Sequence, residues 1–339
     1  MENKRTRIID IAEELGLSTA TVSNVIHGKT KKISDETVRR VQELLEKKQY
    51  IPSMAGILLA QNDSRIIGVV VNDHEKYEGR VLEDTFISSC INELSQEIER
   101  AGYFMMVKTT KKWSEISRFA SMWNMQGLVL IGFCEQDYKK LRDSMHIPFV
   151  VYDGYFQEQP RICNLTIDNY GGGYQVGVYF SKLGHQKVLC ISDNGICVDL
   201  ERYQGLCAGL GAGKADLMMI PMQKEKRRVF YKKNLKKIKS YTAIFALSDY
   251  YAMDLMKFLQ ERGVRIPEDI SVAGFDDTPF CELIYPALTT VRQDQNKRAE
   301  LAVSMLEKLR EEGIEGMTLT LPVTLVERQS TGNRQLNLE

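Results

Sequence analysis

The first 50 residues carry apolar positions at helical spacing and show no strand pattern. The apolar positions form three short runs: Ile8, Ile11, Ala12 and Leu15; Val22, Val25 and Ile26; and Val38, Val41 and Leu45. Gly16 and Gly28 follow the first two runs, and Ser18 and Ser34 precede the second and third as N-caps. We therefore predict three short helices that share one small core.

From residue 66 onward, short apolar runs alternate with helical stretches such as 87–101. The runs that we predict as buried strands are 66–71, 103–107, 127–132, 148–152, 187–192, 243–247 and 271–275. Alternation of strands and helices is typical of parallel sheets that are covered by helices on both faces. These strands are too many for one modest sheet, so we predict two.

The stretch "YIPSMAGILLAQNDSR" (50–65) joins the two regions. Pro52 can start a helix, Ser53 can cap it, and the polar "QNDS" can end it. The alternative is a plain linker. That alternative is weakened by three consecutive apolar residues, 57–59, which have little obvious core to join.

Composition narrows the class of protein. A chain of 339 residues suggests two or three domains, and 43% hydrophobic with 27% charged residues predicts that most of it folds. The formal net charge is zero, so any basic surface for nucleic acid must be local. The apolar runs are too short to span a bilayer and the N-terminus shows no signal-peptide core. We expect a cytoplasmic protein with no membrane partner.

Candidate catalytic and metal chemistry is sparse. The seven cysteines are scattered without a C-x-x-C pair, which favours reduced, mostly buried thiols over a disulfide framework or a zinc site. The four histidines show no metal-ligand spacing. "GLGAG" (209–213) lacks the spacing of a dinucleotide loop, and no nucleophile is paired with a base. We expect no metal, no cofactor and no enzymatic activity.

Helix, glycine turn and second helix form the arrangement that places a recognition helix in the DNA major groove. If the valines of the second helix face the core, Thr19, Ala20, Ser23 and Asn24 project outward. Asn can pair with adenine, and small methyl groups can contact the thymine methyl. The nearby basic residues, which we expect to contact phosphates, include Arg7, Lys31 and Lys32. The alternative, a helical bundle with a solvated basic rim, fits the pattern equally well.

Polar side chains follow several predicted strands: Asn72, Asp73, Asp153, Ser248, Asp249 and Asp276. The carboxyl ends of parallel strands form the ligand-binding edge of such sheets, and two lobes make a cleft. Carboxylates there can accept hydrogen bonds from hydroxyl groups. The same residue types also cap helices, and for Asp168, Asp249 and Asp277 we weigh the two interpretations equally.

The chain as a whole resembles the LacI/GalR family of bacterial transcription regulators. The resemblance begins with "DIA", "LGLSTATVS", "NVIHG", "ISDETVRRV" and "YIP". It continues through "TIDNYGGG", "KLGH", "YTAIFALSDYYAM", "RIPEDISVAGFDDTPF", "PALTTVRQD" and "VERQST", in the family's order. It implies an all-α helix-turn-helix domain followed by an α/β, two-lobed, periplasmic-binding-protein-like effector domain.

The resemblance also assigns roles to residues. Thr19, Ala20 and Asn24 match positions that choose bases, and Ser18, Thr21 and Ser23 match positions that contact the DNA backbone. Residues 52–60 match a hinge helix that folds on DNA. Its Leu59 corresponds to a minor-groove wedge, and Ser53 joins the expected DNA contacts. Arg202 and Asp276 match residues that contact the effector.

The sequence thus predicts a DNA-binding transcription regulator that acts as a repressor and responds to a small-molecule effector, with a sugar favoured. We expect a helix-turn-helix domain at 1–50, a hinge at 51–65, an effector domain at 66–330 and a tail at 331–339. The lobes are expected to comprise 66–162 with 292–322, and 163–291 with 323–330. Without a leucine heptad after "VERQST", a homodimer on a pseudo-palindromic double-stranded operator is favoured over a tetramer. The rivals are a sugar receptor without DNA binding and a sugar-processing enzyme.

Overall fold

A computed structural model of the chain describes residues 6–51, 64–133, 138–145, 147–155, 161–311 and 316–334. The chain divides into two compact units between Ser64 and Arg65. The expected hinge helix at 52–60, including Ser53 and Leu59, lies outside the described residues.

The first unit is a three-helix cluster over residues 6–51, as predicted: α1 (Ile8–Leu15), α2 (Thr19–Ile26) and α3 (Asp35–Lys47). Ser18 and Ser34 cap α2 and α3, each accepting a backbone N–H from three residues later. Gly16 ends α1 with φ +67°, a left-handed conformation that glycine adopts without strain. The shared core contains Ile11, Val22 and Val41.

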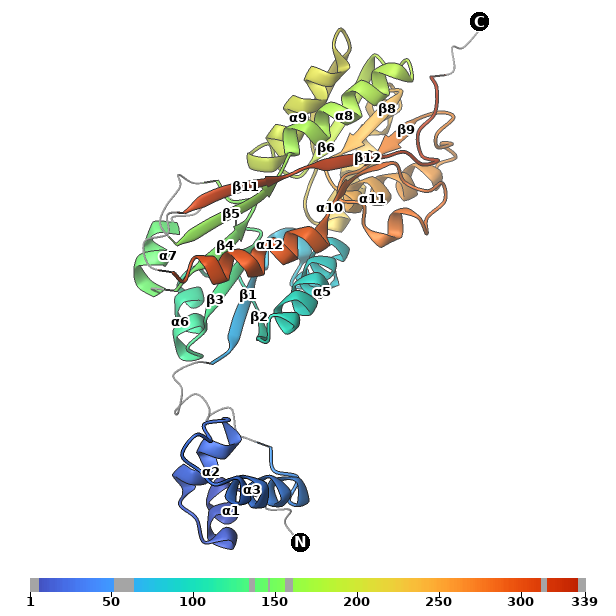
Figure 1. Ribbon diagram of the computed structural model, residues 1–339. Helices are drawn as coiled ribbons and strands as arrows, with labels where there is room; N and C mark the ends of the chain where they lie inside the picture. Colours follow the sequence, from blue (N-terminus) through green and yellow to red (C-terminus); the bar gives the residue numbers. More distant parts are fainter. Residues whose placement is uncertain are drawn as a thin grey trace, which may run out of the picture. The chain divides into compact units, whose positions relative to one another are not determined.

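The second unit contains two α/β lobes, and this confirms the predicted fold class (Figure 1). The first lobe holds a parallel sheet of strand order β11-β5-β4-β3-β1-β2. Its strands are β1 (Ile66–Asn72), β2 (Phe104–Thr110), β3 (Gly127–Ile131), β4 (Phe149–Tyr152), β5 (Ile162–Ile167) and β11 (Met317–Leu321). Its helices are α5 (Thr85–Arg100), α6 (Ser114–Met122), α7 (Tyr138–Met145) and α12 (Gln295–Lys308). Helices α5 and α12 pack together, and α6 and α7 contribute to a separate apolar cluster with the same sheet.

The second lobe holds a parallel sheet of strand order β7-β6-β8-β9. Its strands are β6 (Lys187–Ser192), β7 (Lys214–Met219), β8 (Ala243–Ala246) and β9 (Ser271–Ala273). Its helices are α8 (Asn169–Lys182), α9 (Cys197–Leu210), α10 (Lys224–Ile238) and α11 (Asp249–Gln260). Short 3-10 turns lie at η1 (Glu75–Tyr77), η2 (Val81–Glu83) and η3 (Pro279–Cys281).

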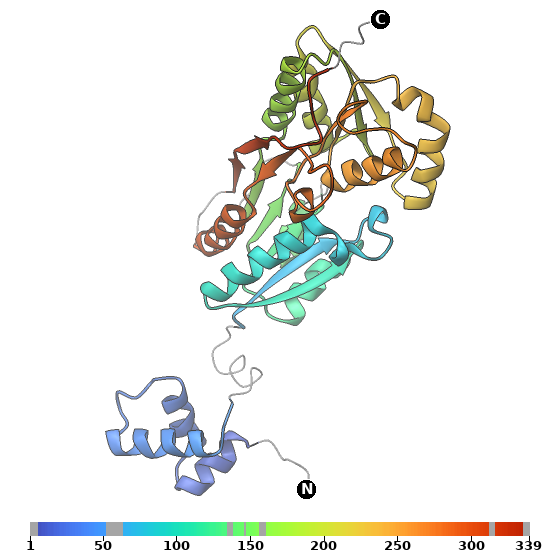
Figure 2. The ribbon, with the colours of Figure 1, turned by 90° about the vertical axis from the view of Figure 1, so that its right-hand side faces the viewer.

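Two crossing strands run between the lobes. Strands β10 (Thr290–Gln293) and β12 (Val323–Val326) form an antiparallel pair, and Figure 1 shows β11 and β12 following one another from one lobe to the other. Figure 2 shows the same two lobes after a quarter turn. Because β5 pairs with β4, it belongs to the first sheet. The expected boundary at 162/163 therefore moves to the end of β5 at Ile167.

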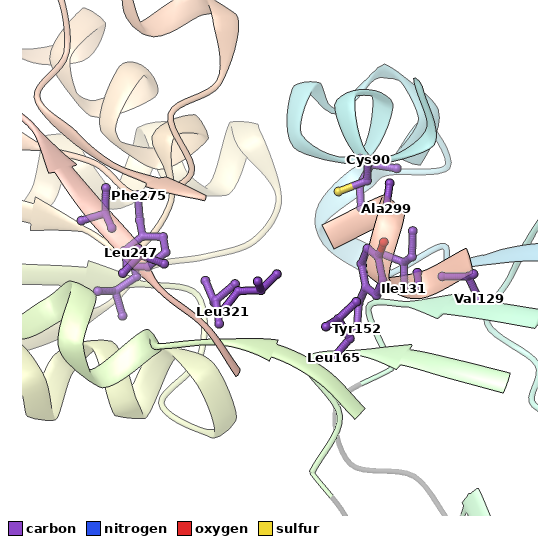
Figure 3. Close-up of a cluster of buried hydrophobic side chains, with 14 of the residues drawn as sticks. Cys90, Val129, Ile131, Tyr152, Leu165, Leu247, Phe275, Ala299 and Leu321 are labelled. Atoms are coloured by element: carbon purple, nitrogen blue, oxygen red, sulfur yellow. The ribbon is translucent and has the colours of Figure 1, made fainter. Parts of the chain in front are cut away.

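The buried core of the second unit reaches into both lobes. Figure 3 shows Leu247, Phe275 and Leu321 in one group and Ile131, Tyr152 and Leu165 in another, with Ala299 of α12 beside Tyr152. Each of these side chains is at most 9% exposed.

The state of the cysteines differs in part from the expectation. Cys197 is disulfide-bonded, so the expectation of reduced cysteines is wrong there. Cys197 begins α9 beside the space between the lobes, and spacing along the chain does not reveal such a pairing. The five cysteines recorded as free are Cys90, Cys163, Cys190, Cys207 and Cys281. Within the described residues, no helix combines the length and the apolar character that crossing a bilayer requires.

Candidate functional site

The outward face of α2 is the first candidate site. Val22 and Val25 are buried in the small core, while Thr19, Ala20 and Asn24 are exposed. Ser18 is also exposed, whereas Thr21 and Ser23 are half-buried; the Ser18 hydroxyl lies 2.9 Å from that of Thr21. The helix thus presents small side chains and one amide, a surface that a nucleic-acid groove can approach closely.

The basic residues expected around this face are exposed. Lys31 and Lys32 lie in the turn before α3. Arg7 precedes α1, where its backbone N–H donates to Asp10 at 2.7 Å and its guanidinium lies 3.2 Å from the same carboxylate. An exposed pair of this kind is weak, so the guanidinium can exchange it for a phosphate.

The second candidate site is a cleft between the two lobes of the second unit. It comprises two adjoining cavities of about 370 and 390 Å³ that share Lys76, Tyr77, Ser248, Tyr251 and Asp276 among their lining residues. Both lobes contribute, since β1 and β4 end on one side and β6 and β8 on the other. The volume is in the range of small-molecule sites.

Five of the seven predicted effector residues line the cleft: Asn72, Asp153, Arg202, Ser248 and Asp276. The Asn72 amide donates to the Gly132 carbonyl at 2.9 Å, and Ser248 caps α11. Arg202 is 6% exposed and donates to the Asn169 side chain at 2.9 Å and the Leu247 carbonyl at 2.7 Å. Its guanidinium also stacks 3.7 Å above the Phe275 ring, so it is held rigidly.

The other two predicted residues lie elsewhere. Asp73 does not line either cavity. Asp249 is fully buried behind the cleft wall, where its carboxylate accepts from the Thr278 N–H, the Thr290 hydroxyl and the Cys281 thiol. For Asp249 the structural interpretation therefore holds.

Asp168 and Asp277 also have structural roles. Asp168 caps α8 by accepting from the Gly171 N–H at 2.7 Å. Asp277 forms ion pairs with Arg292 and Arg328 at 2.5 and 2.7 Å.

Asp153 and Asp276 contribute one carboxylate each from opposite lobes of the cleft, and both have an unusual backbone conformation. Asp153 has φ +57° and Asp276 has φ +124°, both in the region that favours glycine. Such conformations are strained and cluster at functional sites. Burial also raises the pKa of Asp276 well above its ordinary value, although the Arg202 charge opposes the shift. Asp276 is therefore a carboxyl group whose charge is costly without a partner.

Several cleft residues escaped sequence analysis. Asp193 accepts from the Tyr251 hydroxyl at 2.6 Å, and Asn194 donates to Asp193 and Asp199 at 2.7 Å each. Asp193 and Asn194 follow β6 directly, so the rule that found Asp276 could have found them. Lys76 and Tyr251 had no comparable signal, because Lys76 lies in the short 3-10 turn η1 and Tyr251 lies within helix α11, and neither directly follows a strand. Met222 lines the larger cavity.

The cleft can bind a hydroxyl-rich molecule. Carboxylates accept from hydroxyl groups, while Arg202, Lys76 and amide groups donate to them. Burial raises the pKa of Asp199 too. A ligand hydroxyl group that donates a hydrogen bond would therefore stabilise the charged form of both Asp199 and Asp276. Among the described residues no group of three or more His, Cys, Asp or Glu is placed to hold a metal ion.

Both units are similar to known proteins. Residues 7–53 match the model of "Bacterial regulatory proteins, lacI family", and residues 178–331 match "Periplasmic binding protein-like domain". The transcriptional repressor PurR of Vibrio atlanticus (strain LGP32) is 29% identical over 340 residues, which cover 95% of this chain and 98% of PurR.

Solved structures share the fold. A Lac repressor dimer bound to operator and the anti-inducer ONPF aligns with a TM-score of 0.82 at 23% identity, covering 97% of this chain and 100% of that one. The complex of the transcriptional regulator CelR with cellobiose aligns with a TM-score of 0.69 at 21% identity, covering 96% of this chain and 100% of that one.

Proposed function

Because the chain belongs to the LacI family of bacterial regulatory proteins, a family of regulators and not of enzymes, we propose that it represses transcription by binding a specific operator. The observation that carries this proposal is the exposed polar face of α2. Its valines are buried in the small core of the first unit, which fixes the helix with its small polar side chains facing outward. Thr19, Ala20 and Asn24 contact bases, and Ser18, Thr21 and Ser23 contact the DNA backbone.

We also assign the phosphate contacts to Arg7, Lys31 and Lys32, and the hinge contacts to Ser53 and Leu59. Two copies of the chain bind one pseudo-palindromic operator, because a single short recognition helix reads only a few base pairs. The dimeric Lac repressor on its operator supports this arrangement through the shared fold.

A selection from random duplexes tests the DNA-binding role. The wild-type chain should enrich a two-fold symmetric sequence, and Asn24→Ala should lose preference at one base pair of each half-site at a cost of about 1 to 3 kcal/mol. Glu43→Ala, on the exposed side of α3, is the matched control and should enrich the wild-type sequence. Failure of the wild type to enrich any sequence would overturn the operator proposal.

We further propose that the effector is a sugar bound in the cleft by Asn72, Asp153, Arg202, Ser248 and Asp276. The mixture of carboxylates, amides and one fixed guanidinium suits hydroxyl groups, and the CelR complex with cellobiose shows a sugar bound to a protein of this fold. This arrangement also makes binding depend on both lobes, so a ligand can change the angle between them.

A thermal-shift screen tests the effector. One or more mono- or disaccharides should raise the melting temperature, whereas nucleobases should not. Arg202→Ala should abolish the shift, while Arg228→Ala, which removes a half-exposed pair with Glu261, should retain it. A shift with nucleobases alone would refute the sugar assignment and leave the operator proposal standing.

A further inference from the structure

Arg298 lies outside the cleft, yet its contacts reach towards both walls. The side chain projects from α12 of the first lobe and is 0% exposed. One guanidinium nitrogen lies 2.8 Å from an Asp153 carboxylate oxygen and donates to the Leu165 carbonyl at 2.8 Å. The other donates to the Gln293 side-chain carbonyl at 3.3 Å, and the guanidinium plane stacks 4.1 Å from the Tyr152 ring centre.

Gln293 continues this chain of contacts into the second lobe. It stands on the crossing strand β10 and is 5% exposed. Its amide nitrogen donates to the Asp276 carboxylate at 2.7 Å, while its carbonyl also accepts from the Gln295 amide at 3.3 Å. The Asp276 backbone N–H donates to the carbonyl of Val291 on the same strand. The crossing strand thus holds the second-lobe carboxylate by backbone and side chain together.

The chemistry of arginine fixes the direction of this relay. A guanidinium has only donors and stays charged, so the carbonyl of Gln293 must face Arg298 and its amide nitrogen must face Asp276. Asp276 is therefore always offered a donor at one oxygen, and its other oxygen remains for the cleft. Asp153 is likewise held, by Arg298 at one oxygen and by the Thr166 hydroxyl at the other, at 3.0 Å.

We propose that Arg298 is a positioning residue that couples the two cleft carboxylates, Asp153 and Asp276, through the orientation of the Gln293 amide. The inference rests on the proposed function in that the cleft is taken as the effector site. It adds a chain of hydrogen bonds through which a ligand contact at Asp153 can change the position of Asp276. Gln293 bonds to a residue of each lobe, so any displacement of Asp276 relative to Arg298 must alter at least one of these two hydrogen bonds.

Thermal unfolding of the full chain tests the coupling without DNA or sugar. Melting temperatures are measured for the wild type, Arg298→Lys, Asp276→Asn and the double variant, and again for all four with Gln293→Leu. Lysine keeps a charge for Asp153 but lacks the planar fork that reaches Gln293 as well. Residues 298 and 276 share no hydrogen bond or ion pair. Even so, the change in melting temperature of the double variant should be about 2 to 6 °C smaller than the sum of the changes of the two single variants. That shortfall should vanish with Gln293→Leu.

Arg227→Lys is the matched control. Arg227 is also 0% exposed and pairs with Asp254 at 2.7 Å, but none of its hydrogen bonds leads to Gln293. Its shift should add to that of Asp276→Asn. If Arg298→Lys does not fold, Arg298→Leu with Asp153→Leu removes the pair as a whole, an exchange that buried ion pairs often tolerate.

Two results would overturn the inference. One is additive shifts for residues 298 and 276 with Gln293 present; the other is a shortfall that persists with Gln293→Leu. Neither result depends on a sugar or an operator, so failure here is distinct from failure of the proposed function.

Discussion

Two buried carboxyl groups, those of Asp249 and Asp276, make the stability of this protein depend on pH. Asp249 accepts three hydrogen bonds inside the second lobe, yet burial raises its pKa to about 6. Asp276, at the cleft, is shifted in the same direction. Both groups bind a proton more tightly in the folded than in the unfolded chain. Their contribution to stability is therefore complete below about pH 4 and is lost as the pH rises through the folded-state pKa.

Asp249→Asn should consequently flatten the pH profile of stability. Between pH 4 and 7 the wild type should lose up to about 3 kcal/mol through this group, and the variant should lack that part of the loss. Thermal unfolding at several pH values measures the difference between the two profiles. Parallel profiles for wild type and Asp249→Asn would contradict the assignment.

Sequence analysis located single residues well where a strand end or a cap fixed them. Ser18, Ser34, Asn72 and Asp276 are examples. Arg298 could not be found this way, because its partner Asp153 lies far along the chain and only the return of α12 to the first lobe brings them together.

Helices α8 and α9 owe their close approach to glycine. A methyl group on Gly205 would lie 2.0 Å from the Tyr170 carbonyl oxygen, and one on Gly173 would lie 2.0 Å from that of Arg202. These neighbours are backbone atoms and cannot turn aside. Gly173 and Gly205 thus allow α8 and α9 to pack closely, and this contact positions Arg202 at the cleft wall.

Gly205→Ala should push the two helices apart. We expect a fall in melting temperature of about 3 to 10 °C, since overpacking at such a contact is costly, and a weaker thermal shift with the cleft ligand because Arg202 moves. Gly195→Ala, where the nearest side-chain atoms lie 3.8 Å away, is the matched control and should change neither quantity. An unchanged melting temperature for Gly205→Ala would show that the helices separate freely.

Some strands could be predicted from the sequence and others could not. All seven predicted strands are present, and each begins within one residue of its predicted start because a continuous apolar run marks it. Strand β7 was missed because it alternates exposed and half-buried residues at one edge of its sheet. Strands β5, β10, β11 and β12 were not among the predicted strands. Their place in the sheets depends on pairing partners distant in the sequence.

At the scale of the whole molecule, several large apolar side chains are exposed on the second lobe. Tyr250, Phe280, Leu283 and Tyr285 are exposed, and the last two are 76% and 85% exposed. Exposed apolar groups of this size mark interaction sites, and a second copy of the chain is the partner that the proposed operator symmetry requires.

Leu283→Glu should therefore weaken the homodimer. A charge in an apolar self-contact is repeated by symmetry, so two like charges approach one another. Analytical ultracentrifugation should show a dimer for the wild type and a larger monomer fraction for the variant. Leu82→Glu, at an exposed apolar position of the first lobe, serves as the control. Dimers of equal strength in both variants would place the self-contact elsewhere.

At the scale of the whole protein, we propose that a ligand between the lobes sets the affinity of the first unit for DNA. The most direct test of this proposal is the dissociation constant of the full chain for the selected duplex, measured with and without the sugar that raises the melting temperature. We expect a change of at least about fivefold, which Arg202→Ala should abolish without loss of DNA binding. Equal dissociation constants with and without a bound sugar would contradict it.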